Sequence, residues 1–248
     1  MFFPIGDDNS DRHSTPVVNY VLIAINILVF VFLQNFGQDI PFLFAYSTVP
    51  AEILSGTDLI TEASIVTNPV NGQPEDLPGL QYTPVPVYLT LLTSMFMHGG
   101  IAHIAGNMMY LWICGDNLEH AMGHRNYFVF YIICGLLAGL SHVFSSLFSQ
   151  QSLLIPSLGA SGAISGVLAG YMLLFPKKHI HIWILLGIVR VPAILAVGLW
   201  FLFQLINGAG ALGGEEAGGI AYAAHIGGFI AGLLLVKLFV PRASATLR

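Results

Sequence analysis

Six apolar segments constrain the fold of this chain more than any other feature. They cover roughly residues 17–36, 91–114, 127–148, 161–175, 192–206 and 221–240. A membrane-spanning helix needs about 20 mainly apolar residues, and most of these segments approach that length. Only 8% of the residues are charged, whereas a soluble domain has about 25%. We therefore expect an all-α, polytopic membrane protein with six transmembrane helices rather than a soluble enzyme.

One boundary needs an argument, because residues 179–206 could form a single long apolar span. Arg190 would then lie near the middle of the membrane, which is costly for a charged side chain. If Arg190 lies at the cytoplasmic surface instead, residues 179–191 become an interfacial segment. Pro192 then begins the fifth helix, where proline is tolerated in the first turn.

Lysine and arginine alternate between the connections, and this pattern predicts the orientation. They occur before the first segment and after the second, fourth and sixth segments: Arg12, Arg125, Lys177, Lys178, Arg190, Arg242 and Arg248, with Lys237 near the end of the sixth segment. Basic residues favour the cytoplasmic side. We expect a cytoplasmic N-terminal tail (1–16), a membrane domain (17–240) with a long outer first loop (about 38–90), and a cytoplasmic C-terminal tail (241–248). With 8 Lys+Arg against 13 Asp+Glu and no basic stripe, no nucleic-acid partner is expected.

Polar side chains recur at one depth in three apolar segments. Counted from the cytoplasmic side at about 1.5 Å per residue, Ser161 lies roughly 24 Å deep, His225 roughly 25 Å and His103 roughly 20 Å. Polar residues inside a membrane are expensive and usually functional. This coincidence predicts one site built from three helices, below the outer surface.

Serine and histidine at this depth suggest nucleophilic catalysis. Ser161 begins a helix, where free N–H groups favour a developing oxyanion, and Gly159 and Gly162 leave space around it. A serine needs a base, and His225 is the candidate. No acidic residue lies at that depth, so we expect a Ser–His dyad and no metal or cofactor. Small residues at four-residue spacing allow close helix approach: Gly162, Gly166 and Gly170 in the fourth segment, and Gly228 and Gly232 in the sixth.

The second segment supplies candidate oxyanion donors. His103 and Asn107 are four residues apart and share one helix face, and both can donate hydrogen bonds. His98 precedes them and has either a functional role or a role in supporting a loop. His103 and Asn107 could instead hold helices together, Ser161 could be a helix cap, and His225 could be a structural hydrogen-bonding group.

The pattern resembles the rhomboid family of intramembrane serine proteases. The matching motifs are His98-x4-His103-x3-Asn107, Gly159-Ala160-Ser161-Gly162, Ala224-His225-x2-Gly228, and Gly115-Asp116-Asn117-Leu118-Glu119 with Gly123. They extend the likeness over about residues 17–240. The resemblance implies Ser161 as nucleophile and His225 as base. It also implies an oxyanion hole formed by His103, Asn107 and the Ser161 N–H.

The same resemblance implies cleavage of transmembrane segments of membrane-protein substrates in the bilayer. Six spans are typical of the basic prokaryotic form, in the inner membrane with the active site open to the outer side. Substrate entry is expected near the fifth span and the end of the second span, with Trp200, Phe201 and Phe203 as candidate gate residues. The oligomeric state is not predicted.

Two positions depart from the family pattern. The first outer loop lacks the Trp–Arg pair of many members, and Ser165 occupies a position where some members have a tyrosine under the histidine. Two alternatives stay open. One is a non-proteolytic, rhomboid-like protein that binds client transmembrane helices. The other is a channel or transporter, although the spans contain no acidic residue for ion coupling.

Overall fold

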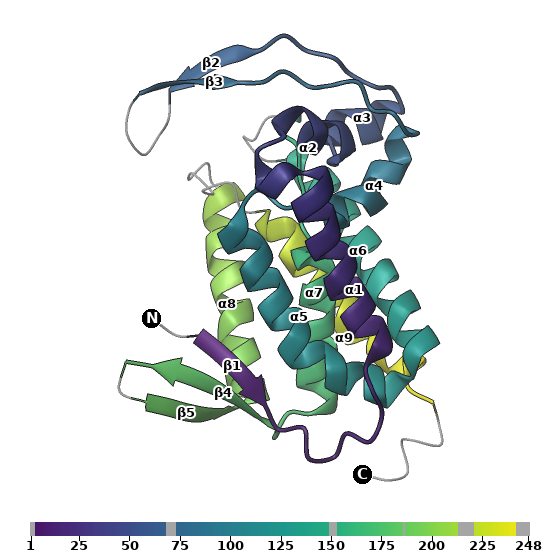
Figure 1. The fold of residues 1–248 in the computed structure, drawn as a ribbon, viewed down its shortest axis with the longest axis vertical. Helices are drawn as coiled ribbons and strands as arrows, with labels where there is room; N and C mark the ends of the chain where they lie inside the picture. Colours follow the sequence, from purple (N-terminus) through teal and green to yellow (C-terminus); the bar gives the residue numbers. More distant parts are fainter. Residues whose placement is uncertain (1–2, 68–72, 149–152, 186, 213–220, 242–248) are drawn as a thin grey trace.

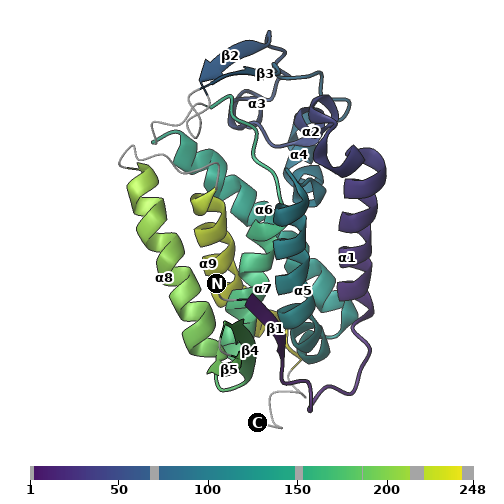
Figure 2. The same ribbon diagram turned by 60° about the vertical axis from the view of Figure 1, so that its left-hand side comes forward.

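The computed structural model describes residues 3–67, 73–148, 153–185, 187–212 and 221–241. The long helices run side by side in one bundle, with strands at both ends (Figure 1). These helices are α1 (Val17–Leu28), continued by the π-helix η1 (Val29–Leu33), α5 (Ile101–Met122), α6 (His124–Ser146), α7 (Ser161–Leu174), α8 (Ala193–Leu212) and α9 (Tyr222–Phe239). Helix α7 lies inside the bundle (Figure 2), and its residues 162–171 are all buried.

Three of these helices are long and apolar enough to cross a membrane: α6, α8 over Ala193–Gly210, and α9. A fourth span results if the bent pair Val87–Phe96 and Ile101–Met122 counts as one, and Val17–Leu33 and Ser161–Leu174 are shorter apolar helices. Each of the six expected segments therefore contains one of these helices. The total of six spans and the cytoplasmic location of both termini stay predictions. Residues 242–248 of the expected C-terminal tail lie outside the described residues.

The second expected segment is not one helix from residue 91, and this expectation was wrong. The chain instead forms η3 (Val87–Leu89), α4 (Thr90–Thr93) and η4 (Ser94–Phe96), and then bends by 80° before α5. Gly99 and Gly100 lie in the bend, and extended backbone at Met97 and Gly100 ends the helical path. His98 therefore lies in a connection and not within a helix.

Two small antiparallel sheets correct the expectation of an all-α fold. Strands β4 (His179–Ile184) and β5 (Gly187–Pro192) form a hairpin, and β1 (Phe3–Asp7) pairs with β4. The expected interfacial segment 179–191 is thus a hairpin, because its many β-branched residues favour extended backbone. Arg190 pairs with His181 in this sheet, outside the helices, and α8 begins directly after Pro192.

Strand β1 is held against the bundle by a partly buried carboxylate. The hydroxyl of Tyr171 in α7 donates to Asp7 Oδ2 at 2.6 Å, and Asn117 Nδ2 of α5 donates to the same oxygen at 2.8 Å. Lys178 Nζ in turn donates to Asn117 Oδ1 at 2.8 Å. Burial raises the pKa of Asp7 from its ordinary value of 3.8 to about 6.

The first loop forms a separate cap at the opposite end of the bundle (Figures 1 and 2). It contains α2 (Ile40–Tyr46), α3 (Pro50–Ser55) and a hairpin of β2 (Ser64–Thr67) and β3 (Pro74–Leu77). Thr48 joins this cap to the segment before α7. Its N–H donates to the Ser157 carbonyl at 2.9 Å, and the Ser157 N–H donates back to the Thr48 carbonyl at 2.8 Å.

Helices α7 and α9 cross at glycines. A Cβ atom on Gly228 would overlap the backbone carbonyl of Gly162, and a Cβ on Gly232 would overlap the backbone of Gly166. Absent side chains therefore let the two backbones touch. The four-residue glycine spacing predicted such an approach, and it determines how close groups on the two helices can come.

Candidate functional site

Ser161 is the first residue of α7, and the backbone before it has an unusual conformation. Gly159 has φ +121°, a value that residues with a Cβ atom rarely adopt. Its N–H donates to the Ser94 carbonyl at 2.8 Å, which fixes the turn into the helix. The first N–H groups of a helix have no partner within it. The Ser161 hydroxyl therefore lies beside free backbone donors at the positive end of the helix dipole.

His225, in the first turn of α9, lies opposite Ser161. Its Nε2 atom is 2.7 Å from Ser161 Oγ, within hydrogen-bond distance. Gly162 follows Ser161 by one residue in α7, and Gly228 follows His225 by three residues in α9. The contact between these two glycines makes the short Ser161–His225 distance possible. The structure thus brings together the two residues whose depths in the sequence matched.

Gln204 of α8 is the third member of this arrangement, and the sequence analysis missed it. Its Oε1 atom lies 2.8 Å from His225 Nδ1. An amide oxygen can only accept a hydrogen bond, so this arrangement fits the tautomer in which Nδ1 carries the ring proton and Nε2 accepts one from Ser161. The available signal was an amide side chain in a largely apolar helix, because a polar residue inside a membrane is a candidate functional residue.

Two aromatic rings lie near the imidazole, whereas Ser165 bonds to the backbone of its own helix. The rings of Trp200 and Tyr222 lie 6.0 Å and 6.5 Å from the His225 ring. Ser165, at the position where some rhomboids have a tyrosine, donates to the Ser161 carbonyl at 2.6 Å. Packing on His225 therefore comes from α8 and from its own helix. Trp200, expected at a substrate entrance, contacts the histidine itself.

His103 of α5 faces the same point. The Gly99 N–H donates to His103 Nδ1 in a long hydrogen bond of 3.4 Å, which makes Nε2 the nitrogen that carries the proton. A Cβ atom on Gly159 would lie 2.8 Å from His103 Nε2 and 3.6 Å from Ser161 Oγ. The missing side chain of Gly159 thus leaves room between the imidazole donor and the serine.

Asn107 and His98, the other two polar residues expected beside His103, differ in their hydrogen-bond partners. Asn107 follows His103 by one turn of α5 and is 7% exposed, and its Nδ2 has no hydrogen-bond partner among the described residues. His98 is fully buried, 5.1 Å from the His103 ring. Its backbone N–H and carbonyl both bond to the Gln34 side-chain amide at 3.0 Å and 2.9 Å. His98 therefore packs against His103, in a connection that the Gln34 side chain holds in place.

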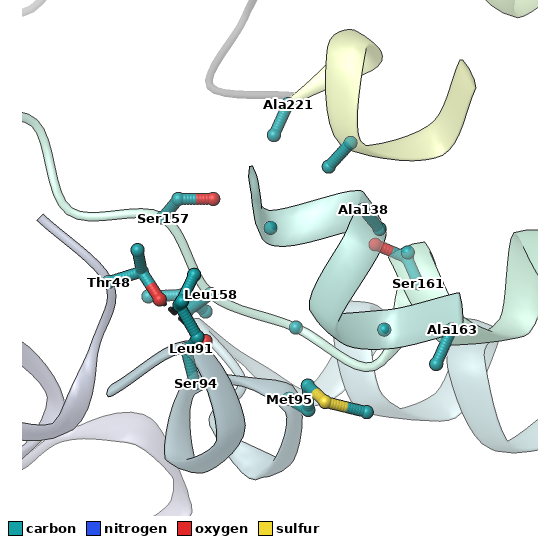
Figure 3. A pocket seen from close by; sticks show the side chains of 15 residues that line it. Thr48, Leu91, Ser94, Met95, Ala138, Ser157, Leu158, Ser161, Ala163 and Ala221 are labelled. Carbon is teal, nitrogen blue, oxygen red and sulfur yellow. Dashed lines mark hydrogen bonds between the residues drawn. The ribbon is translucent and has the colours of Figure 1, made fainter. Parts of the chain in front are cut away.

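A small cavity of about 30 Å³ lies next to Ser161. Figure 3 shows Thr48, Ser94 and Ser157 on one side of it and Ser161 on the other. Thr48 Oγ1 donates to Ser94 Oγ at 2.9 Å, so two side chains on the polar side of the cavity hold each other in place. A water molecule needs about 10–15 Å³ of such space. The cavity can therefore hold about two water molecules beside the hydroxyl.

Fold and site together define a membrane protein whose helices bring a serine, a histidine and a glutamine into one hydrogen-bonded line. A family model described as the Rhomboid domain matches residues 86–242, which is more than half of the chain. The chain therefore belongs to the rhomboid family and is an integral membrane protein.

Individual relatives agree with this assignment. The mitochondrial Rhomboid protein 1 of Saccharomyces cerevisiae is 33% identical over 156 residues, or 62% of this chain and 43% of the yeast protein. Rhomboid protease GluP of Bacillus subtilis is 28% identical over 215 residues, covering 86% of this chain and 36% of GluP. This chain thus spans less than half the length of these relatives.

Proposed function

We propose that this protein is an intramembrane serine endopeptidase that cleaves transmembrane segments of membrane proteins with a Ser161–His225 dyad. The observation that carries the proposal is the 2.7 Å contact between Ser161 Oγ and His225 Nε2, with Nδ1 held by an acceptor. A serine hydroxyl becomes an effective nucleophile when a base accepts its proton. Family membership and the name of the GluP relative support the same reaction.

In the proposed acylation step, Ser161 Oγ attacks the carbonyl carbon of the scissile peptide bond while its proton moves to His225 Nε2. The carbonyl oxygen becomes an oxyanion. When the tetrahedral intermediate collapses, the C–N bond breaks and the imidazolium gives the proton to the leaving amine. The products are an acyl ester on Ser161 and the C-terminal part of the substrate with a free amino group.

His103, Asn107 and the Ser161 N–H would stabilise the oxyanion. The Asn107 amide supports this role, because a buried donor with no partner among the described residues is costly and suits a site that a reacting oxygen completes. The open space beside Gly159 supports it as well, since it adjoins both His103 Nε2 and Ser161 Oγ. Removal of one such donor typically lowers kcat about 10²–10³-fold.

Hydrolysis of the acyl ester requires water, and the hydroxyl-lined cavity supports its supply. A water molecule there would lose a proton to His225 Nε2 and attack the ester carbonyl carbon. The ester C–O bond then breaks and the proton returns to Ser161 Oγ, which releases a carboxylic acid. The substrate must be extended at the cleavage point, because helix hydrogen bonds shield its carbonyl groups.

The proposed setting is the inner membrane of a prokaryotic cell, with the site open to the outer side. Supporting this orientation, the described basic residues belong to segments at the end of the bundle opposite the first-loop cap in Figure 1: before α1, at the start of α6, between α7 and β4, in β5 and in the last turn of α9. They are Arg12, Arg125, Lys177, Lys178, Arg190 and Lys237. Basic residues favour the cytoplasmic side. The cap and the start of α7 would then face outward.

Cleavage of a tagged single-span substrate in liposomes tests the function. We expect the wild-type protein to release two fragments, and Ser161→Ala and His225→Ala to release none while remaining folded. Equal cleavage by all three proteins would contradict the dyad. Binding of the substrate without cleavage by the wild-type protein would favour a rhomboid-like protein that only holds client helices.

A further inference from the structure

We propose that Gln204 is a positioning residue for the dyad: its side-chain oxygen holds the Nδ1 proton of His225, so that Nε2 faces Ser161 as a proton acceptor. The inference rests on the proposed function and extends it to a third helix. It gives the imidazole a neutral support in place of the carboxylate found in serine–histidine–aspartate sites.

Burial shows that Gln204 is not a surface residue of α8. The residue is 4% exposed, whereas its neighbours Leu202, Phe203, Leu205 and Ile206 are each at least 41% exposed. The amide is thus the side chain that this part of α8 turns into the bundle. A buried amide needs hydrogen-bond partners, and His225 Nδ1 at 2.8 Å is one.

The direction of this hydrogen bond determines what the histidine can do. With the amide oxygen against it, Nδ1 must carry the proton and Nε2 has a free lone pair. With the amide turned round, the NH₂ group would donate to Nδ1, and Nε2 would be protonated. Ser161 Oγ at 2.7 Å could then give no proton to Nε2. Only the first arrangement supports general-base catalysis.

Helix α8 contacts the imidazole at two levels. Trp200 lies one turn before Gln204, and its ring is tilted by 35° against the His225 ring at 6.0 Å. The ring contact limits tilting of the imidazole, and the amide limits its rotation. Ser161 and His225 belong to α7 and α9, so the geometry of the dyad also depends on the position of α8.

The Gln204–His225 hydrogen bond involves a neutral amide, so a substitution that introduces a charge at position 204 tests it. Among the described residues, the other titratable side chains that interact electrostatically with His225 are His103 of α5 and His142 of α6, and Tyr222 contacts its ring. None of these is a carboxylate. Gln204→Glu would place a negative charge beside Nδ1, and a carboxylate there stabilises the imidazolium form.

Two variants with nearly the same side-chain length test the inference. Gln204→Met removes the acceptor, and Gln204→Glu retains an acceptor but adds charge. Asn207→Leu is the matched control on α8, because among the described residues the Asn207 amide donates within its own helix, to the Phe203 carbonyl at 2.7 Å. Each variant is reconstituted in liposomes, and kcat and KM for substrate cleavage are measured from pH 5 to 9.

We expect Gln204→Met to lower kcat at least about tenfold with KM nearly unchanged, since general-base catalysis supplies about 10²–10⁴-fold. In Gln204→Glu the acidic limb of the pH profile should move to higher pH. A wild-type kcat in Gln204→Met together with an unshifted profile in Gln204→Glu would overturn the positioning role. Loss of cleavage in Asn207→Leu equal to that in Gln204→Met would also overturn it. A wild-type protein that neither cleaves nor acylates Ser161 would instead overturn the proposed function itself.

Discussion

Gly228 of α9 packs directly on the backbone carbonyl of Gly162 in α7, so that no side chain fits between the two helices at this level. Ser161 precedes one of these glycines, and His225 lies almost one turn before the other. The crossing therefore sets the distance between the hydroxyl and the imidazole. The tight helix contact and the candidate dyad are parts of one arrangement.

Gly228→Ala should separate α7 from α9 and abolish cleavage. The added Cβ meets backbone atoms, which cannot move aside as a flexible side chain can. We also expect a lower Tm in detergent, because overpacking typically costs about 1–3 kcal/mol. Gly198→Ala in α8 is the control, because a Cβ there meets no atom within 4 Å. Full activity of Gly228→Ala would show that the crossing does not control the site.

Gly159→Ala should inactivate the protein with only a moderate loss of stability. The substitution strains a residue at φ +121° and places a Cβ 2.8 Å from His103 Nε2, in the proposed oxyanion space. Gly187→Ala provides a control, since Gly187 has φ +136° but no atom within 4 Å of its Cβ position. It should show comparable backbone strain and unimpaired cleavage. Similar kcat values for both variants would argue against an oxyanion hole beside Gly159.

Asn107→Ala should lower kcat by about 10²–10³-fold while KM changes little, because the amide would act mainly on the transition state. Its Tm should stay near the wild-type value, since Nδ2 has no hydrogen-bond partner among the described residues. Steady-state cleavage kinetics and thermal unfolding separate the two effects. A large loss of Tm with kcat unchanged would assign Asn107 to helix packing.

Asp7 should make stability depend on pH. Burial raises its pKa from 3.8 to about 6, so between these values the folded protein holds a proton at Asp7 that the unfolded chain has lost. The contribution of this group therefore makes the protein less stable as pH rises from about 4 to 6. Asp7→Asn cannot titrate there. We expect the Tm of the wild type, relative to Asp7→Asn, to fall over this range, and a constant difference would contradict the buried carboxyl.

The sequence predicted the helices because apolar segments and the basic residues between them can be read along the chain. It predicted that Ser161 and His225 meet because the depth of each residue in the membrane can be counted from the basic residue that follows its segment. It did not predict Gln204, since the rotation of α8 about its own axis decides whether that side chain faces the bundle or the lipid. The β4–β5 hairpin was missed for a related reason. Its apolar residues are equally consistent with an interfacial segment. The pairing with β1, which is distant in the sequence, distinguishes the two.

The most direct test of the central claim, that His225 activates Ser161, is covalent labelling with a fluorophosphonate followed by mass spectrometry of the peptides. We predict one adduct on Ser161 in the wild-type protein, and none in His225→Ala. Ser165→Ala, which changes a serine one turn away whose hydroxyl donates to the Ser161 backbone carbonyl, should label like the wild type. No adduct on Ser161, or equal labelling with and without His225, would contradict the account.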